Sequence, residues 1–400
     1  MAPESSGATD RKSVLGIAWV AHKGAGADTG NKAEEFIKQL LPPEAFVMTD
    51  RLPDIILFMS GGSEQRAISL MQPEHPVLLL SIRGNNAYAS ATEVMAWMVN
   101  NKRFAMLADA LDARESGLID RWRQVAGAWH SLRGMRAGLI GSVSEWLVAS
   151  NVPAGRLLEK FGVTLVEIPW NTLPDYKEQK PDPTLLNRFS SISTTGLVDA
   201  SRVLTLLRQV VAMKSLSAIA VECFSLVQQR KVTACLALAQ LNNEGLVAAC
   251  EGDLASMAGM MLLKALTGSV PWMANTTRIT ENTLILSHCT AAFDLVTDIR
   301  LATHYETDCS LAVKGTIAAS EVTVFRLSES LDRAFIVEGK VVSHPGMSDA
   351  CRTQVEVELP SQALNLLKTQ PLGNHLLMSP GKHAGFFRLA CTYRGIMAIE

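Results

Sequence analysis

The sequence predicts an α/β protein, with two Rossmann-like parallel-sheet domains followed by a C-terminal, mostly antiparallel β domain. Over residues 13–282, continuous apolar runs alternate with helical patterns, as expected of parallel sheets covered by helices on both faces. Over residues 283–400, short runs of period-two alternation are separated by turn signals, which indicates an antiparallel sheet or barrel. We therefore expect a flexible N-terminus at residues 1–12, Rossmann-like domains at residues 13–133 and 134–282, and a β-rich domain at residues 283–400.

The expected first domain alternates buried strands with helices. The strands expected here are Val14–His22, Ala45–Asp50, Pro53–Gly61 and Pro76–Gly84. The helices expected here are Lys32–Leu41, Glu64–Met71, Ala91–Val99 and Phe104–Leu132. Ser63 and Ser90 are candidate N-caps, because a serine hydroxyl can accept a hydrogen bond from a free N–H of the first helical turn.

The expected second domain repeats the theme of strand, glycine turn and helix. Its expected strands are Met135–Val143, Gly162–Trp170, Ser217–Phe224, Leu246–Cys250 and Pro271–Ala274. Its expected helices are Trp146–Asn151, Leu197–Met213, Thr233–Leu241 and Ala255–Leu266. The proline-containing segment over residues 171–195 is expected to be loop-rich.

The third expected domain is read as a series of short strands. These are Leu284–His288 and the alternating runs SLAVKGTI, EVTVFRLS, RAFIVEGKVV and TQVEVEL. Only Ser361–Lys368 has a helical pattern in this part of the chain. Together with the turn signals between the runs, this pattern favours an antiparallel sheet or barrel.

Composition excludes several classes of function. The chain has 400 residues and a formal net charge of −2, without a Lys/Arg run, so neither nucleic acid nor a membrane surface is an expected partner. The longest apolar runs, such as Met257–Leu263, stop well short of the ~18 residues of a membrane-spanning helix. The polar N-terminus has no apolar core of a signal peptide, and the seven cysteines are odd in number and lack a C-x-x-C pair. We expect a cytoplasmic protein with reduced thiols.

Acidic residues end two apolar strands of the expected second domain. Glu222 ends AIAVECF, and CEGD places Glu251 and Asp253 between a strand and a helix. Because ligands bind at the carboxyl ends of strands in open α/β sheets, these acids are candidates for holding a divalent cation or moving a proton. The alternative is that Asp253 caps the helix starting at Leu254 while the glutamates are solvated.

Histidines follow at the expected strands of the third domain. His288 lies in SHC, and His375 and His383 lie in GNHLLMSPGKH, where a structural role is the alternative for each. THYE adds His304 and Glu306, a weak signal by itself. Two acidic strand ends combined with an imidazole would suit Mn²⁺ or Mg²⁺ better than Zn²⁺.

From about residue 217 onward the chain resembles the L-fucose isomerase/L-arabinose isomerase-like superfamily, in particular its short fucose isomerase-like members. The segments that carry the resemblance are TACLALAQLNNEG, ACEGDLASMAGMMLLKALTG, PWMANTT, LILSHCT and LGNHLLMSPG. The resemblance implies two Rossmann-like domains, a β-rich domain and a divalent metal, usually Mn²⁺, that holds two neighbouring sugar oxygens. It also implies interconversion of an aldose and a ketose through an enediol.

The resemblance assigns roles to individual residues. Asp253 matches the metal-binding aspartate of the acid-x-Asp motif, and His375 matches the late histidine ligand. Fucose isomerases also carry a glutamate in the helix before the Leu-Asn pair, whereas CLALAQLNN has no acid there. We expect Glu222, or alternatively Glu251, to supply this carboxylate as ligand and base. His288 is the expected contact to substrate or proton, with Glu251 as a further substrate contact.

The expected substrate is a hexose or pentose, with deoxy and otherwise modified sugars included. Two other functions stay open: an epimerase or lyase on the same fold, and a sugar-binding protein without catalysis. In the superfamily a neighbouring subunit often completes the cleft, so the resemblance implies a homo-oligomer, a trimer or hexamer. Arg83, Asn85 and Asn86, at the end of a first-domain strand, are candidate substrate contacts; an ordinary strand–helix loop is the alternative.

Overall fold

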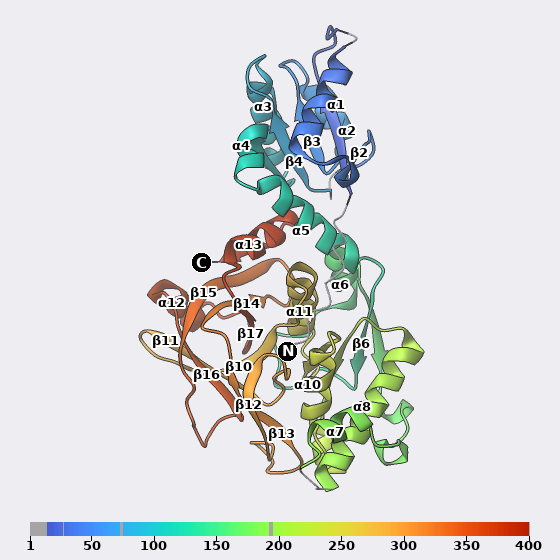
Figure 1. Cartoon of the computed structure of the whole chain (residues 1–400), viewed down its shortest axis with the longest axis vertical. Helices are drawn as coiled ribbons and strands as arrows, with labels where there is room; N and C mark the ends of the chain where they lie inside the picture. The colour runs from blue at the N-terminus through green and yellow to red at the C-terminus, as the bar shows by residue number, and fades with distance from the viewer. Residues whose placement is uncertain (1–13, 27, 73–74, 192–194, 400) are drawn as a thin grey trace, which may run out of the picture. The chain divides into compact units, whose positions relative to one another are not determined.

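The computed structural model describes residues 14–399 apart from residues 27, 73–74 and 192–194, and it confirms the predicted fold class. The chain forms two compact units (Figure 1). The first contains the chain up to Ser131 together with Arg388–Ile396. The second contains Leu132–Phe387 and the strand that begins at Met397.

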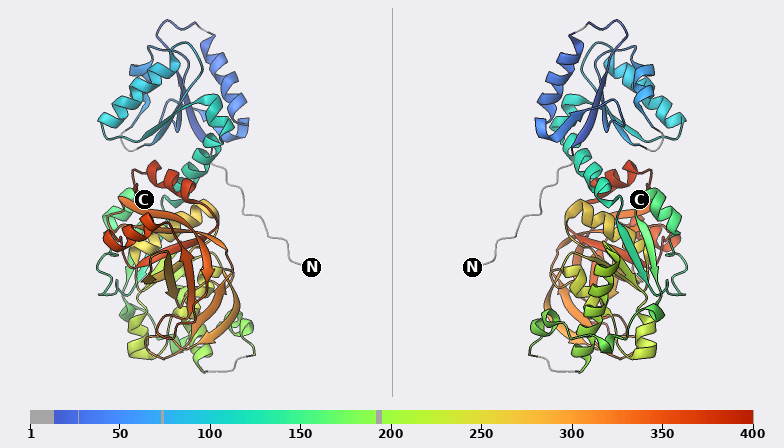
Figure 2. Two further views of the ribbon diagram at one scale, coloured as in Figure 1. Left: turned by 90° about the vertical axis from the view of Figure 1, so that its left-hand side faces the viewer. Right: turned by 90° about the vertical axis from the view of Figure 1, so that its right-hand side faces the viewer.

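The first unit is built on a five-stranded parallel sheet in the order β2-β1-β3-β4-β5. The strands are β1 (Leu15–Val20), β2 (Phe46–Met48), β3 (Ile55–Phe58), β4 (Val77–Ser81) and β5 (Ala105–Asp109). β3 and β4 are buried along their whole length, as expected for central strands of a sheet covered on both faces. Helices lie on both faces of this sheet (Figure 2).

The helices of the first unit follow the strands in alternation. They are α1 (Thr29–Leu40), α2 (Glu64–Leu70), α3 (Ala87–Asn100), α4 (Ala110–Glu115) and α5 (Leu118–Leu132), with the short 3₁₀ helix η1 (Pro43–Ala45). The fully buried Trp122 of α5 donates its indole N–H to the carbonyl of Asp54 at 3.1 Å. Its ring also meets Tyr393 edge-on, which holds the returning C-terminal segment within this unit.

Two expectations for the first unit are wrong. Phe104–Leu132 is not helical throughout, because Ala105–Asp109 pairs with β4 in parallel, and this pairing overrides the helix propensity of Ala, Met and Leu. Asp109 then caps α4 by accepting hydrogen bonds from two N–H groups of its first turn. Ser90 lies inside α3, whose N-cap is Asn86, and bonds to the hydroxyl of Ser63 instead.

The second unit begins with a four-stranded parallel sheet in the order β7-β6-β8-β9. Its strands are β6 (Arg136–Ile140), β7 (Thr164–Ile168), β8 (Ala218–Val221) and β9 (Val247–Cys250). Its helices are α6 (Ala154–Phe161), α7 (Pro183–Arg188), α8 (Thr195–Lys214), α9 (Phe224–Arg230), α10 (Cys235–Asn243) and α11 (Leu254–Thr267), with the 3₁₀ helices η2 (Trp170–Thr172) and η3 (Tyr176–Glu178). The chain runs from β6 outward to β7 and returns to β8 on the other side of β6.

One helix predicted in this region is absent. Trp146–Asn151 forms turns, and α6 begins only at Ala154. Pro153 explains the delay, because a proline disfavours the helical conformation of the residue before it but suits the start of a helix.

The third sheet curls into a closed ring (Figures 1 and 2). Its order is β14-β17-β10-β11-β16-β15-β18, and an additional pairing between β14 and β15 closes the barrel. All its pairings are antiparallel except β15–β18. The strands are β10 (Trp272–Ile279), β11 (Thr283–His288), β14 (Glu321–Leu327), β15 (Arg333–Ser343), β16 (Thr353–Glu358), β17 (His375–Pro380) and β18 (Met397–Ile399).

A hairpin and two helices complete this part of the chain. The hairpin is β12 (Val296–Ala302) with β13 (Ala312–Ile317). The predicted helix is found as α12 (Ser361–Thr369), but α13 (Ala384–Tyr393) is a second helix that was not predicted. Its first turn covers part of the barrel, where Phe387 packs edge-on against Phe325.

Helix α11 joins the barrel to the parallel sheet of the second unit. It packs on β8 and β9 on one side and on β14 and β17 on the other. A Cβ atom at Gly259 would lie 2.7 Å from a methyl group of Leu377, so a glycine is needed for this close approach. The N-terminus of α11 is thereby held beside the strands that carry the predicted histidines.

Candidate functional site

Two sheets of the second unit bring the predicted acids and histidines together. Glu251 follows β9 directly, and Asp253 is the N-cap of α11. In the barrel, Asn275 of β10 pairs with Ser287 on one side and with His375 on the other. β11 therefore ends, and β17 begins, at the same rim, which places His288 and His375 near each other.

The loop after β9 adopts an unusual conformation that presents Glu251. Glu251 has a left-handed backbone with φ of 58°, and Gly252 follows with φ of 69°. A Cβ atom at Gly252 would lie 2.3 Å from the carbonyl oxygen of Ser142, so this position requires glycine. A non-glycine residue in the left-handed region costs on the order of 1 kcal/mol, and such strain often occurs at functional sites.

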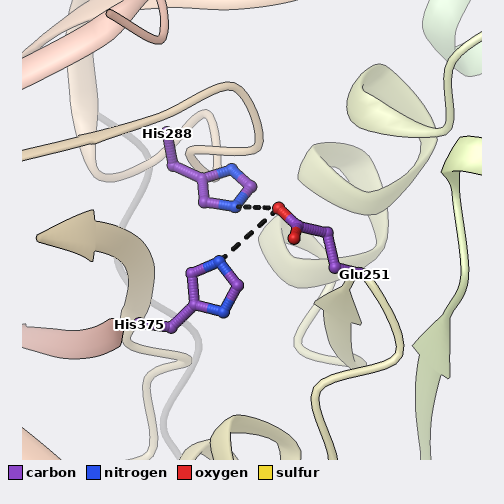
Figure 3. A group of neighbouring side chains, drawn as sticks. All are labelled: Glu251, His288 and His375. Atoms are coloured by element: carbon purple, nitrogen blue, oxygen red, sulfur yellow. Dashed lines mark ion pairs between the residues drawn. The ribbon is translucent and has the colours of Figure 1, made fainter. Parts of the chain in front are cut away.

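Glu251, His288 and His375 form a buried cluster (Figure 3). The Oε1 atom of Glu251 lies 3.5 Å from Nε2 of His375 and 3.9 Å from Nε2 of His288. One ligand atom from each residue lies within 4.8 Å of the other two. The three side chains point toward a common centre from the loop after β9, the end of β11 and the start of β17.

His375 is held in place from behind by Asp253. Its Nδ1 atom lies 2.9 Å from Oδ2 of Asp253, which also accepts a hydrogen bond from Arg326 at 2.9 Å. The backbone N–H and hydroxyl of Ser256 bond to the same carboxylate, and all of these side chains are buried. Because Nδ1 of His375 donates to this carboxylate, Nε2, which faces Glu251, is the nitrogen that must lose its proton before the ring can bind a cation.

The electrostatics of the cluster keep both acids ionised. Burial alone would raise the pKa of Glu251, but His375, His288 and the indole of Trp146 lower it to about 2. Burial acts in the same direction on Asp253, and Arg326 and His375 hold its pKa well below the usual range. Although burial opposes it, the two carboxylates raise the pKa of His375 to about 9.

His288 has a different environment. Burial and the neighbouring His375 lower the pKa of His288 to about 3, so its ring is neutral. Its Nδ1 atom accepts a hydrogen bond from the backbone N–H of Cys289 at 2.8 Å and lies 3.1 Å from the hydroxyl of Thr290. This arrangement places the ring proton on Nε2. For Nε2 to bind an ion, this proton must leave it; if the proton moves to Nδ1, the hydrogen bond from Cys289 is lost and the hydroxyl of Thr290 becomes the acceptor.

The cluster could bind a metal ion. Within the part of the chain that the structure describes, the Nε2 atoms of His288 and His375 are buried and have no hydrogen-bond partner. Separations of 3.5 and 3.9 Å are compatible with atoms that each lie roughly 2.1 Å from a shared ion. Buried polar atoms normally have partners, so two orphaned nitrogens facing a carboxylate fit a cation.

The predicted ligand set differs from this cluster in two residues. Asp253 has no exposed surface, and its oxygens accept hydrogen bonds from Ser256, Arg326 and His375, so it lies behind His375 rather than beside the shared centre. Glu222 instead caps α9: its carboxylate accepts the backbone N–H of Ser225 at 2.9 Å. Neither acid belongs to the group of three ligand atoms, whereas Glu251, the predicted alternative, does.

The other predicted contacts lie in the first unit. Arg83 is exposed and forms ion pairs with Asp109 and Asp112 at 3.2 and 2.6 Å. Asn85 and Asn86 are left-handed and line an open cavity of about 970 Å³ at the carboxyl ends of β1, β3 and β4. The Glu251 cluster lies wholly in the second unit, so their role in substrate binding stays a prediction.

Two features of the site were not predicted. Trp146 is 46% exposed, yet its indole N–H bonds to Oε2 of Glu251 at 2.7 Å. Arg326 is fully buried between Asp253, Ser256 and Ser150. The sequence EVTVFRLS could have indicated this role for Arg326, because a charged side chain buried in an apolar strand requires a partner of opposite charge.

Comparisons with known proteins find sugar isomerases. The sulfoquinovose isomerase of Alkalicoccus urumqiensis is 24% identical over 248 residues, which are 57% of this chain and 56% of that protein. The sulfoquinovose isomerase of Priestia aryabhattai is 29% identical over 175 residues, 41% of this chain and 38% of that protein. The protein of the same name from Clostridium sp. (strain MSTE9) is 23% identical over 309 residues, 71% of this chain and 67% of that protein.

In the first two of these matches the chain spans about half, or less, of the length of the curated relative, 56% and 38%. No protein-family model matches the chain. The likenesses are thus to sugar isomerases as a class and do not single out the fucose isomerase/arabinose isomerase superfamily. Among the residues that the structure describes, no helix is both long and apolar enough to cross a membrane.

Proposed function

We propose that the chain is a metal-dependent sugar isomerase that interconverts an aldose and a ketose. The observation that carries this proposal is the buried cluster of Glu251, His288 and His375, in which two imidazole nitrogens face one carboxylate oxygen and make no hydrogen bond to any residue that the structure describes. The relatives named sulfoquinovose isomerase support a modified aldohexose, deoxygenated or sulfonated, as the substrate class.

The donor set favours Mn²⁺ over Mg²⁺. Mg²⁺ is bound mainly by oxygen ligands, whereas Mn²⁺ is the first member of the transition-metal series that binds sites of mixed nitrogen and oxygen ligands. The cluster offers two imidazoles and one carboxylate, one imidazole more than the sequence predicted. When bound, such an ion would polarise the carbonyl and hydroxyl oxygens of the sugar and so favour enediol formation.

We assign Glu251 the place of the acid that CLALAQLNN lacks. Its carboxylate is ionised at neutral pH, because the facing histidines and Trp146 outweigh its burial, so no proton has to leave before it binds a cation. Asp253 acts as a positioning residue that fixes the ring orientation and tautomer of His375.

An aromatic wall beside Glu251 suits a sugar. Trp146 packs edge-on against Phe224 with ring centroids 4.7 Å apart, and almost half of the Trp146 surface is accessible. An aromatic side chain that combines an accessible face with an anchored indole N–H offers apolar contact to the C–H groups of a sugar ring.

Metal binding provides the first test. We expect isothermal titration with Mn²⁺ to show tight binding to the wild type, a loss of at least 100-fold for Glu251→Gln and His375→Gln, and weaker Mg²⁺ binding throughout. Glu222→Gln is the matched control, since it makes the same chemical change at a neighbouring strand end and should bind Mn²⁺ as the wild type does. Equal Mn²⁺ affinity of all these proteins would refute the site.

Activity provides the second test. With Mn²⁺ present, the wild type is incubated with sulfoquinovose, glucose, fucose and arabinose, and ketose formation is followed by NMR. We expect turnover of at least one of these sugars. Elimination products would indicate a lyase, and an aldose epimer without ketose would indicate an epimerase; either result would refute the isomerase.

A homo-oligomer, either a trimer or a hexamer, remains part of the proposal. The implied completion of the cleft by a neighbouring subunit, with Arg83, Asn85 and Asn86 as contacts, supports this expectation. Sedimentation velocity gives the subunit number, and a monomer that is fully active at nanomolar concentration would contradict it.

A further inference from the structure

The turn between β12 and β13 carries a pair of titratable side chains that the proposed metal site does not use. His304 is buried, and its Nε2 atom lies 3.3 Å from Oε2 of Glu306. Its other nitrogen, Nδ1, lies 3.0 Å from the hydroxyl of Thr307. The carboxylate of Glu306, in contrast, is 42% exposed, so one end of this pair is fixed in the protein and the other is accessible.

This pair lies beside the cluster. The ring of His304 packs edge-on against Phe224 at 5.8 Å, and Phe224 packs in the same way against Trp146. Trp146 in turn donates its indole N–H to Glu251. A continuous path of side chains thus joins the turn to the ligand cluster.

The pKa shifts of Glu306 and His304 agree with a position of this pair near the Glu251 cluster. Burial raises the pKa of Glu306, the charge of Glu251 raises it further, and His375 acts in the opposite sense. Burial lowers the pKa of His304, so its imidazole is neutral. Glu306 is not among the three clustered ligands, and its side-chain contact is with His304.

A neutral His304 can support Glu306 in either protonation state. When Glu306 is ionised, Nε2–H of His304 donates to the carboxylate while Nδ1 accepts from the hydroxyl of Thr307. When Glu306 is protonated, its O–H donates to Nε2 while Nδ1–H donates to the hydroxyl oxygen of Thr307. The hydrogen bonds among Glu306, His304 and Thr307 can thus form both before and after Glu306 takes up a proton, as a proton carrier requires.

The other carboxylates near the cluster are less suited to this task. Asp253 is fully buried and accepts hydrogen bonds from Ser256, Arg326 and His375. Glu251 has a pKa of about 2, which makes it a weak base, and it faces both histidines. Glu222 caps α9. Glu306 combines a raised pKa with an accessible carboxylate.

We propose that Glu306 carries the proton between C2 and C1 of the sugar and that His304 is its positioning residue, an inference that rests on the proposed isomerase function. The carboxylate of Glu306 takes the proton from C2 of the aldose, the C2–H electron pair forms the C1=C2 bond, and the π pair of C1=O1 moves onto O1. The O2 proton passes to O1, the C2=O2 bond forms, and the C1=C2 electron pair takes the proton back from Glu306 at C1. No net proton or electron is gained or lost.

The test uses the full chain with Mn²⁺ and a sugar that the wild type converts. Isomerisation is followed in D₂O by NMR, which reports both ketose formation and incorporation of deuterium at C1. We expect Glu306→Gln to lower kcat by ~10²–10⁴ and to abolish deuterium incorporation, while Mn²⁺ affinity stays within about threefold of the wild type. Asp308→Asn is the matched control: it removes the same charge from the same turn, and the Asp308 side chain is 85% exposed.

His304→Phe tests the positioning role, because it keeps the ring contact with Phe224 but removes both nitrogens. We expect kcat to fall at least tenfold with KM and Mn²⁺ affinity unchanged, whereas a merely structural residue would change KM and the melting temperature as well. Glu306→Asp keeps a carboxylate on a shorter side chain and should recover part of the deuterium incorporation. This variant also keeps the proposal testable if Glu306→Gln fails to fold.

The outcomes separate this inference from the proposed function. A wild type that converts a sugar, together with a Glu306→Gln protein as active as Asp308→Asn, would overturn the proton-carrier role and leave the isomerase intact. A wild type that converts none of the sugars, with Mn²⁺ bound, would overturn the proposed function and the proton-carrier role together.

Discussion

Replacement of Asp253 by Asn is the perturbation that best tests how the site is built. Asn keeps an oxygen that can accept the N–H of Ser256, so the cap of α11 is retained. It replaces the other oxygen by an NH₂ group, which faces two donors, Nδ1 of His375 and Nη1 of Arg326. Two charge-assisted hydrogen bonds are lost, and the fully buried guanidinium of Arg326 is left without its counter-charge.

The structure sets the expected magnitudes. Removing one partner of a buried ion pair costs roughly 3–5 kcal/mol, so urea denaturation should show a fall of that size in the free energy of unfolding. Loss of the carboxylate behind a metal-bound histidine weakens metal binding roughly 10- to 100-fold. Titration with Mn²⁺ should therefore show a drop within that range, because Glu251 and His375 remain.

A double variant separates the two effects. In Asp253→Asn with Arg326→Met, the unpaired buried charge is gone, and we expect stability to recover by more than half while Mn²⁺ affinity stays low. A loss of Mn²⁺ affinity well beyond 100-fold in the stabilised double variant would refute a positioning role and make Asp253 a direct ligand, as the sequence predicted. Wild-type affinity in both variants would refute any role in metal binding.

Two further predictions concern stability. In the metal-free protein the pKa of Glu251 is lowered to about 2 from an ordinary 4.5, so its contribution to stability is complete above pH 4.5 and is lost as pH falls toward 2. The pKa of His375 is raised to about 9 from 6.5, so its contribution is complete below pH 6.5 and is lost as pH rises through 9. The lowered pKa of His288, about 3 against 6.5, costs stability as pH falls below 6.5, so melting temperatures of metal-free protein should peak near pH 6.5. An unchanged melting temperature from pH 6.5 to 9 would contradict the His375 assignment. Gly252→Ala should cost at least ~2 kcal/mol of unfolding free energy and weaken Mn²⁺ binding, since its Cβ would lie 2.3 Å from the carbonyl oxygen of Ser142 at a φ of 69°. Gly155→Ala is its control, because a Cβ there meets no described atom within 4 Å and alanine favours the helix; equal melting temperatures of the two variants would argue against the strained loop.

Much of the fold could be predicted from local patterns. Buried runs such as Pro76–Gly84 identified the parallel sheets, and alternating runs such as EVTVFRLS identified the β-rich part. β14 is nevertheless buried at every position after Glu321, because other elements cover both of its faces. The prediction that Phe104–Leu132 is one helix is wrong because Ala105–Asp109 forms a strand through its pairing with β4. The residue types of this segment favour a helix and do not reveal that pairing. Closure of the barrel likewise depends on the pairing of β14 with β15, which the local sequence pattern does not reveal.

The site was predictable in its parts but not in its arrangement. Glu251, His288 and His375 were all singled out, because polar residues at the ends of apolar strands are costly without partners. The spacing C-E-G-D could not tell which acid faces the histidines. The left-handed backbone at Glu251 and Gly252 turns the glutamate toward the cluster, while Asp253 becomes the helix cap. Backbone conformation, not residue type, decides between them.

The packing of α11 couples assembly of the site to assembly of the second unit. Glu251 and Asp253 belong to the edge of the parallel sheet, whereas His375 and Arg326 belong to the barrel. Neither sheet alone holds a complete set of ligands, and Arg326 buried in the barrel has no counter-charge until Asp253 arrives. The same contact that neutralises Arg326 also orients His375, so correct docking of the two sheets and formation of the ligand cluster are a single event.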